Sequence, residues 1–191
     1  IIQKEEIVFA KKKKKQELAE KKKKEAAEKE RIRLTNLNNT GIWDVTYYVD
    51  DFGEATKQGY IRNTKKIRGT FSNTATQDSK LDVRFLISND SDISIKLYEY
   101  AGNNPVKAYS TKLYKVLIQD DDGNRFKATA KNYSERLSFD KVWSREIHKA
   151  LMKGGTIKFR IIEEDAQTNE YSFNIRDAGF YDNAYRKLHE S

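Results

Sequence analysis

Beyond residue 41 the chain alternates apolar and polar residues with a period of two. The clearest run is KLDVRFLIS (80–88), in which every second residue from Leu81 to Ile87 is apolar. This pattern is typical of a strand that buries one face. We count up to nine such runs, of which the other eight are IWDVTYYV (42–49), GYIRN (59–63), RGTFSN (68–73), DISIKLYEY (92–100), KLYKVLIQ (112–119), RFKATAK (125–131), TIKFRII (156–162) and YSFNIRD (171–177).

Short segments rich in Asn, Asp and Gly separate these runs, among them SNDSD (88–92) and DDDGN (120–124). Such residues are typical of tight turns. One-face alternation joined by turns indicates antiparallel sheets, and this number of strands indicates a sandwich or a barrel. Of the two, we predict an antiparallel β-sandwich of eight or nine strands over residues 35–191, decorated by one or two short helices.

The pattern changes to a helical period near the end of the chain. Asp140 can cap a helix that Gly154 ends. Between them, apolar residues recur at every fourth position: Trp143, Ile147 and Leu151. This spacing predicts one amphipathic helix, and FYDNAYRKLHE (180–190) predicts a second, shorter one.

Residues 1–34 have a different composition, with 11 Lys, 2 Arg, 7 Glu and no Pro or Gly. Their residue types favour a helix, and several Glu–Lys pairs four residues apart support it. The Asn-rich segment LTNLNNTG (34–41) then breaks the pattern. We therefore predict a long charged helix over 1–34, acting as a stalk or arm, and a separate β domain over 35–191.

Most of the chain's net charge of +8 belongs to this arm, which carries +6, whereas residues 35–191 carry +2. A nucleic-acid-binding domain is expected to show a basic footprint on its folded part, so the count argues against a nucleic-acid partner. The arm itself could contact protein subunits of an assembly or anionic lipid headgroups. The residues predicted to make these contacts are an apolar patch and a basic run: Ile7, Val8, Phe9, Lys11, Lys12, Lys13, Lys14 and Lys15.

Little in the sequence points to a chemical site. The chain has no Cys and its two His lie on different predicted helices, which argues against thiolate and zinc sites. Asp120, Asp121 and Asp122 form a weak candidate for calcium, although consecutive carboxylates before a Gly are more typical of a hairpin turn. We predict no cofactor and no catalytic residue. The run GTFSNTAT (69–76) suits either a tightly packed strand followed by a polar loop or a contact surface.

The order of these segments resembles a known class of protein. The residues that carry the resemblance are IWDVTYY (42–48), DDFGEAT (50–56), SKLDVRFLISNDSDISIKLYEY (79–100), LMKGGTIKFRI (151–161) and YSFNIRDAGFYDNAYRKL (171–188). Over residues 42–188 the chain is similar to β-sandwich proteins that bacteria export to the periplasm or hold there as lipoproteins. It also resembles accessory proteins of type VI secretion. The resemblance implies a non-catalytic envelope protein.

Our leading hypothesis is a non-enzymatic interaction or structural module of a bacterial envelope assembly, in which a β-sandwich is held on a charged helical stalk. No apolar run approaches the ~20 residues of a membrane helix, so we expect any anchor to precede Ile1. Two alternatives stay open. One is a structural component of a phage or virion, and the other is a hydrolase whose site cannot be recognised from sequence.

Overall fold

The computed structural model describes residues 2–36, 38–99, 102–106 and 112–189, and for residues 2–14 and 33–35 it describes the backbone alone. The chain divides into two compact units, Ile1–Asn39 and Thr40–Ser191.

The first unit contains helix α1 (Ile2–Thr35), so the predicted N-terminal helix is present. The structure describes its side chains over residues 15–32 alone, which is a shorter segment than the predicted helix over 1–34. Every side chain in 15–32 is exposed. Arg31 pairs with Glu28 at 2.8 Å. No helix in the described part of the chain is both long enough and apolar enough to cross a bilayer.

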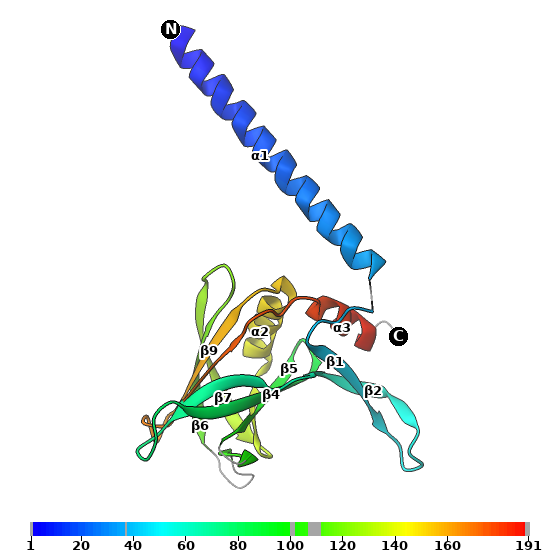
Figure 1. The fold of residues 1–191 in the computed structure, drawn as a ribbon, viewed down its shortest axis with the longest axis vertical. Helices are drawn as coiled ribbons and strands as arrows, with labels where there is room; N and C mark the ends of the chain where they lie inside the picture. The colour runs from blue at the N-terminus through cyan, green and yellow to red at the C-terminus, as the bar shows by residue number, and fades with distance from the viewer. Residues whose placement is uncertain (1, 37, 100–101, 107–111, 190–191) are drawn as a thin grey trace. The chain divides into compact units, whose positions relative to one another are not determined.

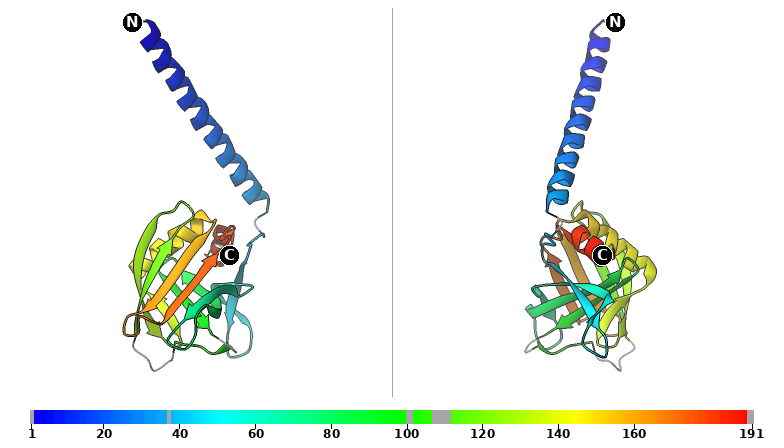
Figure 2. Two further views of the ribbon diagram at one scale, coloured as in Figure 1. Left: turned by 60° about the vertical axis from the view of Figure 1, so that its left-hand side comes forward. Right: turned by 90° about the vertical axis from the view of Figure 1, so that its right-hand side faces the viewer.

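Within its described residues, the second unit contains ten antiparallel strands and two helices. Figures 1 and 2 show their arrangement. Its elements are β1 (Trp43–Val49), β2 (Ala55–Asn63), β3 (Ile67–Ser72), β4 (Ser79–Asn89), β5 (Asp92–Tyr98), β6 (Leu113–Gln119), β7 (Arg125–Tyr133), β8 (Arg136–Phe139), α2 (Lys141–Lys153), β9 (Ile157–Glu163), β10 (Glu170–Ile175) and α3 (Tyr181–His189).

Eight of these strands close into a barrel. They follow the order β4-β3-β10-β9-β6-β7-β8-β5, and β5 pairs back with β4. The predicted sandwich is therefore wrong, although the mainly β class is confirmed. Alternation with one buried face is common to both architectures, and only the pairing of β5 with both β4 and β8 makes the sheet close on itself.

The strand that closes the barrel is the one that the sequence reading missed. β8 has only four residues, too few to show alternation, and it bridges β7 and β5. Ser134 and Glu135 form the turn before it, with φ of 46° and 61°. Two-residue turns of this kind usually carry Asn-Gly or Asp-Gly, so Ser-Glu gave no turn signal.

Strands β1 and β2 form a hairpin that lies outside the barrel, and it joins β4 through the single pair Ile61↔Ile87. Side chains of Asn63 and Trp43 add further contacts to the rest of the domain. Asn63 donates to the carbonyl oxygens of Lys65 and Val83. Trp43 is buried, and its indole N–H donates to the carbonyl of Ala178 at 3.4 Å.

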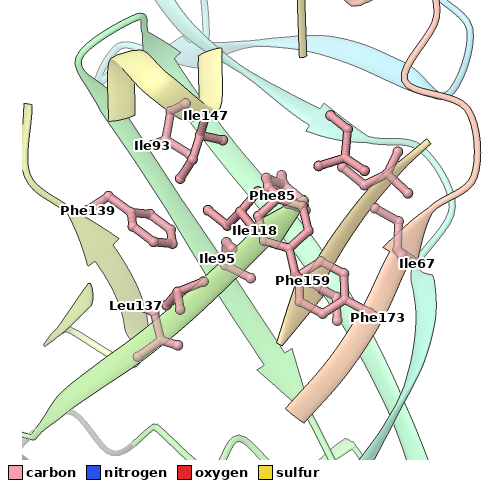
Figure 3. Close-up of a cluster of buried hydrophobic side chains, with 14 of the residues drawn as sticks. Ile67, Phe85, Ile93, Ile95, Ile118, Leu137, Phe139, Ile147, Phe159 and Phe173 are labelled. Atoms are coloured by element: carbon pink, nitrogen blue, oxygen red, sulfur yellow. The ribbon is translucent and has the colours of Figure 1, made fainter. Parts of the chain in front are cut away.

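The barrel interior is apolar, and Figure 3 shows part of it. Phe85, Phe159 and Phe173 pack with ring centroids 4.8–6.0 Å apart. Ile147 of α2 enters the same core. Both predicted helices are confirmed. α2 begins at Asp140, whose side chain accepts from the Trp143 N–H, and ends at Gly154.

Candidate functional site

The outward-facing positions of the eight barrel strands, here called the barrel wall, carry much more basic than acidic charge. Alternation sends every second residue of each strand outward, and eleven of these are Lys or Arg, against three Asp or Glu. The basic ones are Arg68, Lys80, Arg84, Lys96, Lys115, Arg125, Lys127, Lys131, Arg136, Lys158 and Arg160. The acidic ones are Asp82, Asp92 and Glu170.

This charge distribution corrects the expectation, drawn from the sequence, that the folded domain has no basic surface. The near-neutral total for residues 35–191 suggested that the folded domain has no basic footprint. Most acidic residues of the domain instead lie in turns, in the β1–β2 hairpin and on the helices, which leaves the wall basic. The missed signal was the alternation of Lys and Arg within strand runs such as RFKATAK (125–131) and IKFR (157–160).

A depression of about 440 Å³ lies on the wall over β6, β7 and β9, and we call it the wall depression. Leu117 stands at its centre, with Lys127 and Arg160 as cross-strand neighbours. Gln119 stands beside it, paired across the strands with Arg125 and Lys158. The depression thus has an aliphatic centre surrounded by four cationic side chains.

Two of these four cations already have partners. Arg160 binds both carboxylate oxygens of Glu170, at 2.6 and 2.8 Å. Arg125 donates to the Gln119 side-chain oxygen at 3.1 Å. Lys127 and Lys158 have no ion pair or hydrogen bond from their ammonium groups to any residue that the structure describes. Their charge is available to an external anion.

A second hollow, of about 750 Å³, opens where β3 and β10 separate. Their pairing ends at Phe173↔Gly69, whereas β9 still pairs with β10 as far as Ile175. Asp82 lies 3.9 Å from the Lys66 ammonium and 3.7 Å from that of Lys80. The basic residues lining this groove are Lys65, Lys66, Arg68, Lys80 and Arg176. The groove extends the basic surface beyond the wall depression.

The three carboxylates of the weak calcium candidate, Asp120, Asp121 and Asp122, all contact other groups of the protein. The Lys153 ammonium lies 2.9 Å from Asp120 and 3.1 Å from Asp122. Asp121 accepts from the backbone N–H of Thr156 at 2.7 Å. Among the residues that the structure describes, no group of three or more His, Cys, Asp and Glu could hold a metal ion. The segment forms the β6–β7 hairpin turn, as its sequence suggested.

The other predicted contact residues lie in the arm. The side chains of Ile7, Val8, Phe9 and Lys11 to Lys14 are outside the described residues, and Lys15 is exposed on α1. They stay a prediction.

The two histidines sit in an aromatic cluster. The Nδ1 atom of His148 lies 3.1 Å from the Tyr181 hydroxyl, and the His189 ring contacts Tyr185. Burial lowers the pKa of His148. The cluster joins α2 to α3.

On the described barrel strands, Glu163 of β9 is a charged residue at an inward position. Glu163 is buried and binds Lys112 and Asn169. Burial and the nearby Glu163 raise the pKa of Tyr114 to about 12. The Glu163 carboxylate is thus engaged by one ammonium and one side-chain amide.

Comparison with family models, with curated proteins and with solved structures finds no match to this chain. The proposal below rests on the charge of the barrel wall.

Proposed function

We propose that this chain is a non-enzymatic interaction module whose basic barrel wall docks on an acidic surface of a partner protein. The observation that carries the proposal is the ratio of eleven basic to three acidic residues on the wall. A surface of one sign attracts a partner of the opposite sign and steers its approach.

The shape and composition of the wall favour a protein partner. Single-stranded nucleic acids bind in grooves where bases stack on aromatic residues, but the outward positions of the described barrel strands hold only two aromatic residues, Tyr98 and Tyr133. The wall instead has aliphatic residues among its cations, including Leu113 and Leu117. The wall depression has the size and lining to receive one side chain of a partner.

The proposal is tested by titrating the full chain with fluorescein-labelled poly-L-glutamate at low salt and following fluorescence anisotropy. The wall variant carries Lys127→Gln, Lys131→Gln and Lys158→Gln. We expect about tenfold weaker binding, because each exposed ion pair contributes up to about 1 kcal/mol and 1.4 kcal/mol is a factor of ten.

A matched arm variant, with Lys22→Gln, Lys23→Gln and Lys24→Gln, removes the same charge from α1. If the arm variant loses as much affinity as the wall variant, the wall is not the binding surface. Tighter binding to duplex DNA or to vesicles of anionic phospholipid than to poly-L-glutamate would also contradict a protein partner.

Placement at a bacterial envelope, and use of the arm as a stalk or membrane contact, stay predictions that rest on the sequence resemblance. The wall proposal is independent of them, since it depends only on charges within Thr40–Ser191. A virion component would be distinguished by stoichiometric packing with other chains.

A further inference from the structure

The tip of the β1–β2 hairpin presents an exposed aromatic ring on an ordered turn. Phe52 is 92% exposed, the highest value among the large apolar residues that the structure describes. The Asp50 carboxylate accepts from the backbone N–H groups of Phe52 and Glu54, both at 2.9 Å. Gly53 follows with φ of 83°, a conformation that favours glycine. The turn therefore holds Phe52 outward in water.

Acidic side chains flank this ring. Asp51 and Glu54 are exposed, and their carboxylates form no ion pair or hydrogen bond with other described residues. Isolated exposed apolar residues are common on protein surfaces, but a fully exposed Phe between free carboxylates is a specific chemical pattern. We call residues 50–54 the hairpin tip.

The hairpin tip is complementary to the wall depression in both polarity and charge. The depression has Leu117 at its centre and the aliphatic stems of Lys and Arg around it, so it can cover an aromatic ring. Guanidinium and ammonium groups at its rim can also interact with the face of that ring. The free ammonium groups of Lys127 and Lys158 match the free carboxylates of Asp51 and Glu54.

One molecule cannot make this contact with itself. The hairpin joins the barrel at β4, and β9 and β6 stand third and fourth from β4 along the eight-strand barrel. The wall depression therefore lies across the barrel from the hairpin. In Figure 1, β6 and β9 lie on the opposite side of the barrel from β1 and β2. Two different copies of the chain are required.

We infer that the hairpin tip of one copy inserts Phe52 into the wall depression of the next copy. This inference rests on the proposed function, because it names the acidic partner of the wall as a second copy of this chain. The contact is heterologous: each bound pair leaves one free tip and one free depression. Such contacts extend into a linear chain or close into a ring.

Sedimentation velocity of the full chain over a range of concentrations tests the inference. Wild type should show a sedimentation coefficient that rises with concentration and falls again in high salt. Phe52→Ala should weaken self-association by about tenfold or more, as expected for an aromatic anchor in a pocket. The control is Val142→Ala, which trims a 63% exposed apolar residue on α2, outside the barrel wall, and should associate like wild type.

Charge exchange gives a second, independent test. A basic-tip variant (Asp51→Lys, Glu54→Lys) and an acidic-wall variant (Lys127→Glu, Lys158→Glu) should each be monomeric alone. In the mixture, the basic tip of the first fits the acidic wall of the second, and the unchanged acidic tip of the second fits the unchanged basic wall of the first. Association should therefore be restored, with the two variants alternating along a chain or ring. Asp50 is left unchanged because it holds the turn. A mixture that stays monomeric would overturn the inference.

Poly-L-glutamate binding separates failure of this inference from failure of the proposed function. Phe52→Ala lies outside the wall and should bind poly-L-glutamate like wild type. A wild type that binds poly-L-glutamate but stays monomeric at all concentrations refutes self-association and leaves the proposed function standing. A wild type that does not bind poly-L-glutamate refutes both the proposed function and the self-association that rests on it.

Discussion

At the scale of single residues, Gly69 of β3 marks a place where two strands of the barrel approach each other closely. A Cβ atom placed there would lie 2.2 Å from the Ser172 carbonyl oxygen and 2.6 Å from the Cβ of Phe173. Both belong to β10, the neighbouring strand. Of the two interpretations offered for GTFSNTAT (69–76), the tightly packed strand is therefore the one that the structure supports at its first residue.

Replacing Gly69 by Ala should destabilise the protein by about 1–3 kcal/mol, because β3 and β10 must move apart to admit the methyl group. Urea denaturation measures the loss. Thr70→Ala is the matched control, since Thr70 is the exposed next residue of the same strand and should change stability by less than about 0.5 kcal/mol. Equal stability of the two variants would contradict the close approach.

At the scale of elements, Asp120 connects the β6–β7 turn to the end of α2. Its side chain is 8% exposed and accepts from Lys153. Hydrogen bonds from Lys153 and Asn124 lower the pKa of Asp120 to about 2, below its unfolded value of about 3.9. A carboxyl with a lowered folded-state pKa stabilises the fold above its unfolded pKa, and this contribution is lost as the pH falls toward the folded value.

Asp120→Asn should therefore be less stable than wild type at pH near neutral, and the difference should shrink as the pH falls from about 4 to about 2. Free energies of unfolding in urea across this range measure it. Asp122→Asn is the control: its side chain is 67% exposed and binds the same Lys153, so its loss should stay below about 1 kcal/mol. A difference for Asp120→Asn that does not change with pH would contradict the assignment.

Local sequence patterns predicted most of the strands and both helices of the β domain, but not that the sheet closes into a barrel. The alternation in KLDVRFLIS (80–88) reported which face of β4 is buried, and Asp140 and Gly154 marked the ends of α2. The barrel depends on long-range pairing through β8, a strand whose length and turn gave no local signal. The basic wall was hidden because charge was summed over the domain and not over each face of each strand.

At the scale of the whole molecule, the excess of positive over negative charge is concentrated on α1 and on the barrel wall. Composition revealed only the first, because acidic residues elsewhere in Thr40–Ser191 balance the second. The proposed function assigns binding to the wall, where cations surround an aliphatic depression. Interfaces with such a centre and a charged rim are specific, whereas the exposed lysines of α1 offer charge alone.

Mapping the binding surface by NMR tests this assignment most directly. The full chain, isotope-labelled, is titrated with unlabelled poly-L-glutamate, and backbone amide shifts are followed residue by residue. The largest changes should occur in β6, β7 and β9, around Leu117, Lys127 and Lys158, with smaller changes in α1. Changes confined to α1, with the strands unaffected, would contradict the wall as the docking surface.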